Sequence, residues 1–210
     1  MIRTSSVRRR LAAAAGVLLA TAALSACGTG PAHQGSAAVV GGERISIATV
    51  EARVGAVRTA AAAQQGGGAE PAGLSRRMVH ELVLDKVVDR ALADHQLEVT
   101  AGEIAQAREA DGKLLGGEDG LVRALVLKQY VPAGEIDAFY HQQLGIQKLA
   151  TAAGKDSRTA DGVAAIRSAL ATAGEELSIQ VNPRYGSWDS KQISLVDSAD
   201  AWLPQPAASA

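Results

Sequence analysis

The chain has 210 residues, with 21 lysines and arginines against 22 aspartates and glutamates, and its formal net charge is −1. This balance lacks the basic excess that nucleic-acid binding requires, so we expect no nucleic-acid partner. Cys27 is the only cysteine, which excludes an intrachain disulfide and a cysteine-rich zinc site. Aromatic residues make up 3% of the chain, so leucine, valine, isoleucine and alanine must build the core.

The first 26 residues have the plan of a secretory signal peptide. Arginines at 3, 8, 9 and 10 give a basic start, and residues 11–23 form an uncharged segment of mostly alanine, leucine and valine. That segment is shorter than the roughly 20 apolar residues of a membrane-spanning helix. Leu24-Ser25-Ala26-Cys27 follows it and resembles a bacterial lipobox. The alternatives are an ordinary signal peptide that is cut near a cysteine, or a buried cysteine.

The lipobox resemblance implies a lipoprotein signal peptide at 1–26 and lipidation at Cys27. Diacylglycerol would join the thiol, and a fatty acid such as palmitate would acylate the new amine. The remaining 184 residues would carry a formal net charge of −5, because four arginines are lost. We expect this part to be anchored on the extracytoplasmic face of the cell membrane without spanning it. Residues 27–36 are rich in glycine, proline and serine, and we interpret them as a flexible tether.

The pattern after the tether predicts a strand, several helices and a final strand. Residues 37–40 form a β-prone run that ends in a tight turn at Gly41-Gly42, and residues 45–47 alternate. A helix is expected over 49–64, and a stronger one over 75–96 with Ser75 as its N-cap. The second of these has a wide apolar stripe, so we expect it at the centre of the core.

The segment Thr100-Ala101-Gly102-Glu103 has the form of a capping box and predicts a helix to about residue 115. Apolar spacing predicts further helical segments at 121–130, 132–153 and 159–173. Residues 177–181 alternate, which indicates a strand. We hypothesise that the strands at the two ends of this mainly α body pair with each other. The predicted domain covers 37–190, and residues 191–210 are interpreted as a C-terminal tail.

Three segments resemble the N-terminal chaperone domain of the SurA, PrsA and trigger-factor group. They are residues 39–45, the apolar helix 78–96 with the following 99–104, and residues 181–189, which resemble the C-terminal strand and turn of actinobacterial lipoproteins that carry this domain. The resemblance covers about residues 37–190 and implies a mainly α, SurA N-terminal-like fold. Many relatives also have a parvulin isomerase domain of about 90–100 residues, a typical small-domain size, for which this chain has no room. Isomerase activity is therefore not implied.

Searching for catalytic chemistry leads to no enzyme prediction. His80 and His95 are fifteen residues apart on one predicted helix, too far for one metal centre. The acidic residues Asp85 and Asp89 alternate with Lys86, which indicates a solvated, salt-bridged face. There is no nucleophile elbow, phosphate loop or dinucleotide fingerprint. We therefore predict no cofactor, no metal and no catalytic residue.

The resemblance and the lipobox together predict an ATP-independent chaperone of the cell envelope, with unfolded or exported polypeptides as its partners. Exposed apolar side chains could bind such clients, because hydrophobic burial tolerates many sequences. The candidate client-binding residues are Met78, Val79, Leu82, Phe139 and Tyr140, which could equally belong to the core. The alternative function is a specific protein-binding or scaffold lipoprotein with the same fold.

Overall fold

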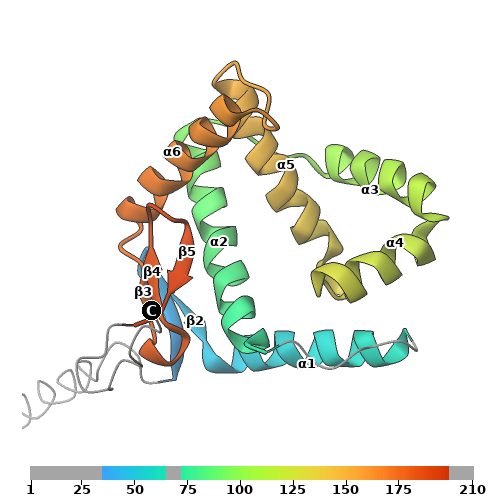
Figure 1. Cartoon of the computed structure of the whole chain (residues 1–210), viewed down its shortest axis with the longest axis horizontal. Coiled ribbons are helices and arrows are strands. Elements are labelled where there is room, and N and C mark those ends of the chain that lie inside the picture. The colour runs from blue at the N-terminus through green and yellow to red at the C-terminus, as the bar shows by residue number, and fades with distance from the viewer. Residues whose placement is uncertain (1–34, 65–71, 199–210) are drawn as a thin grey trace, which may run out of the picture.

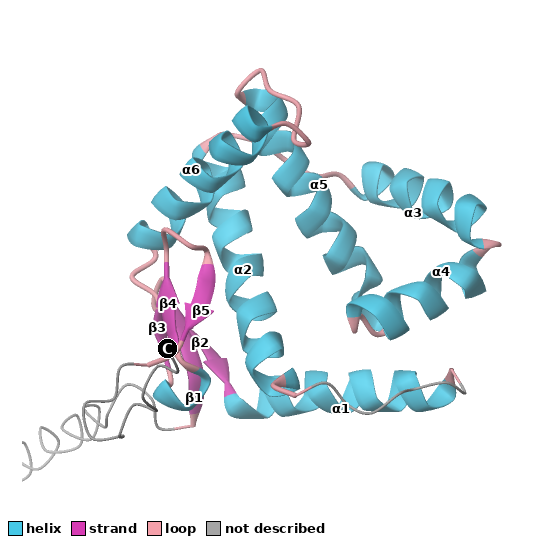
Figure 2. Cartoon of the chain, in the orientation of Figure 1, coloured by secondary structure: helices cyan, strands magenta, loops and turns pink. Residues whose placement is uncertain are grey.

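The computed structural model describes residues 35–64 and 72–198. Its helices form an open arch, and the short strands gather at one base of the arch (Figure 1), as the colouring by secondary structure also shows (Figure 2). The described α-helices are α1 (Ile47–Ala63), α2 (Leu74–Asp94), α3 (Ala101–Leu115), α4 (Glu118–Ala124), α5 (Ile136–Ala152) and α6 (Ala160–Glu176). The expected mainly α fold is confirmed.

The ends of the domain pair in one small antiparallel sheet. Strands β1 (Ser36–Val40) and β2 (Glu43–Ser46) are joined at Gly41 and Gly42, whose φ values of +58° and +83° suit glycine. Strand β3 (Gln180–Val181) pairs with the other edge of β1, with Val181 opposite Ala38. The hypothesis of pairing ends is confirmed. The final strand is shorter than predicted, because Leu177 is the C-cap of α6 with a helical backbone and Ser178 has a φ of +48°.

Helix α2 is the centre of the main core, as its apolar stripe predicts. The side chains of Val79, Val83, Val87 and Val88 are fully buried, and α2 contacts α1, α5, α6 and β1. Close approach of α5 depends on Gly145, since a Cβ there would lie 3.0 Å from both Leu92 Cδ1 and Val88 Cγ1. The predicted N-cap at Ser75 is wrong. The helix starts one residue earlier, and its N-cap is Gly73 in the left-handed region, with no side-chain cap.

Helices α3 and α4 form an arm with a small core of its own. The arm also contains the π-helix η1 (Leu125–Gln129) and the 3₁₀ turn η2 (Ala133–Glu135), and it leads into the start of α5. Five buried residues of the arm and the start of α5 pack together, and we call them the arm cluster: Leu121, Leu125, Val131, Ile136 and Tyr140. The predicted capping box is present, since Thr100 accepts from the Glu103 backbone and the Glu103 carboxylate accepts from the Thr100 backbone.

A C-terminal hairpin extends the domain beyond its predicted boundary. After the 3₁₀ turn η3 (Pro183–Tyr185), strand β4 (Ser187–Asp189) pairs with β5 (Ser194–Val196). Arg76 on α2 holds this hairpin by donating to the Leu195 carbonyl oxygen at 2.8 Å and to Asp197 at 2.5 Å. The predicted tail of 191–210 therefore starts too early, because residues 191–198 contain β5.

The predicted tether of 27–36 likewise extends one residue too far. Ser36 is fully buried as the first residue of β1, and its hydroxyl donates to the Ala38 carbonyl oxygen at 2.8 Å. The predicted signal peptide, Cys27 and the segment 203–210 lie outside the described residues. Within the ranges 35–64 and 72–198, no helix is both long enough and apolar enough to cross a membrane.

Candidate functional site

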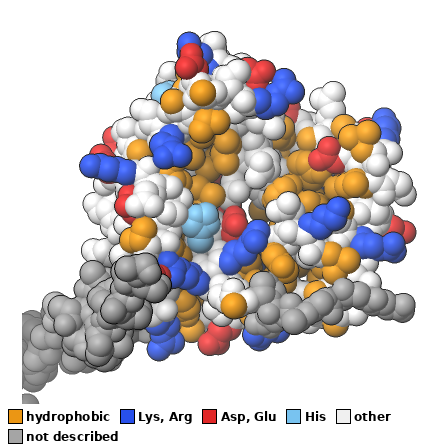
Figure 3. Space-filling view, viewed as in Figure 1, with side chains coloured by type: hydrophobic (Ala, Val, Ile, Leu, Met, Phe, Trp, Pro, Cys, Tyr) orange, Lys and Arg blue, Asp and Glu red, His pale blue; other side chains and the backbone are white. Residues whose placement is uncertain are grey.

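The inner face of the arch contains a groove of about 830 Å³, which we call the cradle groove. Acidic, basic, histidine and hydrophobic side chains meet near the middle of this face (Figure 3). Three walls line the groove, each from a different part of the sequence: Thr49, Ala52, Arg53 and Ala56 from α1; Leu82, Asp85, Lys86 and Asp89 from α2; and Glu135, Ala138, His141 and Gln142 from the end of η2 and α5.

Helical periodicity explains how α1 supplies its wall. Val50, Val54 and Val57 recur every three or four residues and are buried in the main core. Ala52 and Ala56 belong to a neighbouring stripe of the same helix and are exposed to the groove. Their small side chains leave space between α1 and the other two walls, so the groove remains open along this helix.

Arg53 joins the three walls electrostatically. Its guanidinium lies 3.6 Å from an Asp85 carboxylate oxygen and 3.6 Å from a Glu135 carboxylate oxygen, and only 14% of its side chain is exposed. Gln142, which is buried, donates from Nε2 to Asp85 Oδ1 at 2.7 Å. Burial raises the pKa of the Asp85 carboxyl, and the attraction of Arg53 and the hydrogen bond from Gln142 offset only part of this effect.

The remaining charges differ in how completely they are paired. Lys86 Nζ donates to both carboxylate oxygens of Glu43 on β2, each at 2.9 Å, so the α2 cation already has a partner. Asp89 is more open, with 55% of its side chain exposed, and the ring nitrogen His141 Nδ1 lies 3.7 Å from its Oδ1. Asp89 therefore forms an ion pair with His141 only when this histidine is protonated.

A family model described as the SurA-like N-terminal domain matches residues 4–120, more than half of the chain. The chain belongs to this family. The match includes all of α1 and α2, which supply two walls of the cradle groove, and it ends within α4. No curated protein and no solved structure matches the chain. Membership relates the chain to a chaperone family and is consistent with polypeptide binding at a general level.

The five predicted client-binding residues are divided between the two cores and the cradle groove. Met78 and Val79 are buried in the main core, and Tyr140 is buried in the arm cluster with its hydroxyl donating to Asp111 Oδ2 at 2.7 Å. Phe139 packs partly buried against the arm cluster. Only Leu82 lines the cradle groove. The alternative that most of these residues belong to the core is therefore the one the structure supports.

Sequence reasoning missed three residues of the cradle groove: Arg53, Glu135 and Gln142. Arg53 and Glu135 are ordinary surface charges when each is considered alone, and nothing local in the chain connects them. Gln142 did leave a signal, because it falls on the same helical stripe as Phe139 and Leu149. A polar residue on an apolar stripe needs a buried hydrogen-bond partner, which here is Asp85.

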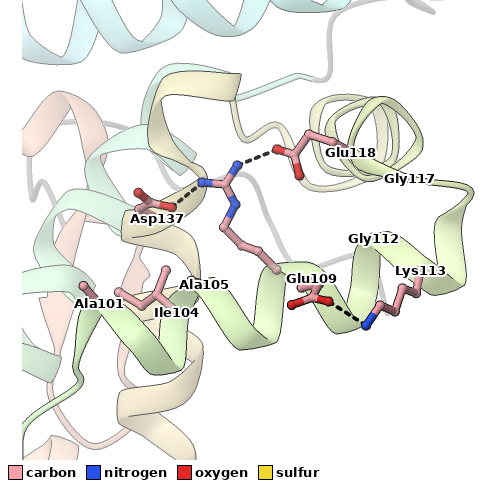
Figure 4. A pocket seen from close by; sticks show the side chains of 10 residues that line it. Ala101, Ile104, Ala105, Glu109, Gly112, Lys113, Gly117, Glu118 and Asp137 are labelled. Atoms are coloured by element: carbon pink, nitrogen blue, oxygen red, sulfur yellow. Dashed lines mark hydrogen bonds and ion pairs between the residues drawn. The ribbon is translucent and has the colours of Figure 1, made fainter.

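A second groove of about 510 Å³ lies between α3, α4 and α5 (Figure 4). Arg108 is at its centre and donates to Asp137 on α5 and to Glu118 on α4. Glu109 and Lys113 form an ion pair along α3 at 2.6 Å. These bonds occupy the guanidinium from two sides, so we interpret the residue as a clamp of the arm and regard the cradle groove as the better binding site.

The described residues offer no metal-binding cluster, since no three His, Cys, Asp or Glu side chains in ranges 35–64 and 72–198 are arranged to hold an ion. His80 instead contacts the C-terminal hairpin, with Nε2 lying 3.2 Å from the Ile193 carbonyl oxygen. His95 is the exposed C-cap of α2. Both positions agree with structural or solvated roles for these histidines.

Proposed function

We propose that this protein is a membrane-anchored extracytoplasmic lipoprotein that binds unfolded or exported polypeptides without ATP. The observation that carries the proposal is the cradle groove, an open channel built largely by the family-matched helices α1 and α2. Its walls combine the methyl groups of Ala52, Ala56 and Ala138 with the side chain of Leu82. A client segment could bury apolar side chains there while its backbone remains accessible to polar groups on the rim.

The proposed mechanism is transient binding. Hydrophobic burial is non-directional and contributes about 25 cal/mol per Å² of apolar surface, so many client sequences gain from it. Ala52, Ala56 and Ala138 in the groove are exposed to solvent, so a client can bind there and leave without the domain opening. We propose no covalent chemistry and no isomerase activity, and the protein is expected not to accelerate proline isomerisation in a short peptide.

The proposed anchor is lipid on Cys27. Ser36, where β1 begins, is the ninth residue after Cys27. Even a fully extended chain spans only about 3.3–3.6 Å per residue, so the domain would lie within about 30 Å of the lipid. Metabolic labelling with a tagged palmitate tests this: wild-type protein should incorporate the label, and a Cys27→Ser variant should not. Absence of label from the wild-type chain would refute the anchoring proposal.

Aggregation of an unfolded client provides the functional test. The soluble fragment 28–210 retains every described residue and should suppress the light scattering of a chemically denatured client after dilution. Ala56→Trp places a bulky ring in the cradle groove and should reduce the suppression. Ala164→Trp, at an exposed position of α6, is the matched control and should not. If the fragment has no effect in molar excess, or both variants behave alike, the groove is not a chaperone site.

The scaffold alternative predicts a different outcome in affinity capture. A chaperone should retain many weakly bound exported proteins, and their recovery should fall together in the Ala56→Trp variant. A scaffold should retain one partner in a fixed ratio.

A further inference from the structure

The cradle groove carries more negative than positive charge. Its lining contains the carboxylates of Asp85, Asp89 and Glu135 and the cations of Arg53 and Lys86, so it has one uncompensated negative charge when His141 is neutral. Glu43 lies beside the groove and binds Lys86, which adds a further negative charge to the group. The groove therefore combines apolar walls with an acidic character.

Both cations are committed to partners within the domain. Arg53 is mostly buried and lies between Asp85 and Glu135, while Lys86 is drawn toward β2 by its two hydrogen bonds to Glu43. The Arg53 side chain is 14% exposed and that of Lys86 is 38% exposed, so both are less accessible than the 55% exposed carboxylate of Asp89. An anionic client segment would have to displace one of these pairs, at a cost in free energy.

The carboxylates retain capacity to accept hydrogen bonds. Asp89 is 55% exposed, and the ring nitrogen His141 Nδ1 lies 3.7 Å from its Oδ1. The Glu135 side chain is 37% exposed, and its Oε2 lies 3.6 Å from Arg53 Nη2, which is longer than a hydrogen bond. An ionised carboxylate has about four acceptor positions, so both can bind an ammonium or guanidinium group from a ligand.

We propose that the cradle groove selects polypeptide segments in which a lysine or arginine stands beside small or branched apolar residues. A basic side chain contacts Asp89 or Glu135, and the apolar side chains lie against Leu82 and the alanines of α1 and α5. This inference rests on the proposed function and names its client class.

The test compares two labelled ten-residue peptides of alanine, valine and leucine, one with two central lysines and the other with two central glutamines. Fluorescence anisotropy with fragment 28–210 at low salt should give a dissociation constant about two- to fivefold lower for the lysine peptide, as expected for partly exposed ion pairs. The difference should shrink at about 0.5 M salt, where surface charges are screened.

Matched variants locate the effect. Asp89→Asn removes one groove carboxylate and should weaken lysine-peptide binding about two- to fivefold while leaving the glutamine peptide unchanged. Asp161→Asn on α6 makes the same change in net charge outside the groove and should leave both peptides unchanged. Equal weakening by both variants would show that net charge alone matters, and it would overturn the proposed site.

The outcomes separate the client class from the proposed function. If both peptides bind equally well and aggregation is suppressed, the chaperone function stands and the basic preference is refuted. If neither peptide binds and aggregation is not suppressed, both proposals fail. If sedimentation shows that the fragment binds a second copy of itself through a surface that Asp89→Asn weakens, the groove is a dimer interface and the inference is overturned.

Discussion

The separation between arm and main body predicts that one core substitution will loosen the arm alone. Leu121 is 1% exposed and belongs to the arm cluster, whereas Met78 is 2% exposed and belongs to the main core. The two clusters share no fully buried residue, although α5 contributes to both. We therefore compare Leu121→Ala with Met78→Ala, two truncations of similarly buried side chains.

The expected magnitude follows from burial. Leu121→Ala removes about three carbons, each worth about 0.8 kcal/mol when buried, and leaves a cavity whose walls lose their contacts. Together these effects place the cost at about 2–5 kcal/mol, with a similar range for Met78→Ala. The arm cluster contains only five buried residues, so such a loss is a large fraction of what holds α3 and α4 against α5. Local opening of the arm should then require less free energy than global unfolding.

Native-state hydrogen exchange resolves the two effects. In Leu121→Ala, amides of α3 and α4 should exchange faster, while amides at the centre of α2 keep nearly the wild-type rate. In Met78→Ala, protection of the α2 amides should fall with global stability. If Leu121→Ala lowered the protection of the α2 amides as much as Met78→Ala does, the arm and the main body would unfold as one unit. That result would refute the prediction that the arm opens separately.

Three further predictions concern particular contacts. Burial raises the pKa of the Asp85 carboxyl above its ordinary value of 3.8, so the folded protein loses stability as pH rises through the folded pKa. Asp85→Asn has no carboxyl to titrate, so urea unfolding should show that the stability of this variant relative to wild type increases from pH 3 to pH 7. A stability difference that stays constant over this range would contradict the prediction. Arg76→Ala should lower the free energy of unfolding by about 1 kcal/mol and make residues 190–198 more sensitive to limited proteolysis. The control Arg167→Ala, on the exposed face of α6, should not have this effect. Equal cleavage of the two variants would show that the contacts of Arg76 do not hold the hairpin. Thr100→Ala should destabilise α3 by about 0.5–2 kcal/mol, whereas Thr100→Asp should retain the N-cap. Hydrogen exchange of the first α3 amides measures the difference, and equal exchange rates in the two variants would refute the capping role.

The same capping box has a pH signature. Hydrogen bonds from Lys148 and from Thr100 lower the pKa of the Glu103 carboxyl to about 2 from an ordinary value of 4.5. The contribution of the Glu103 carboxylate to folding stability is therefore complete above the unfolded pKa of 4.5, and it is lost as pH falls toward about 2.

Local chemistry was sufficient to predict much of the helical architecture. The α3 capping box joins residues three apart, and the α2 stripe repeats every three or four residues, so both patterns are complete within a short window of sequence. The pairing of the end strands could also be proposed, because two β-prone segments at opposite ends of a helical chain have few other partners. In contrast, the start of α2 was misplaced because Gly73 supplies the N-cap by its backbone conformation rather than through a side chain.

The cradle groove was decided by tertiary structure. Arg53, Asp85 and Glu135 are far apart in the chain, and they meet only because α1, α2 and the start of α5 converge on one face. Periodicity can show that Met78 or Leu82 belongs to an apolar stripe, but it does not show which part of the stripe another helix covers. Helices α1, α5 and α6 pack against α2 in such a way that Met78 is buried and Leu82 lines the groove. Which residues of the stripe are covered depends on where these neighbouring helices lie.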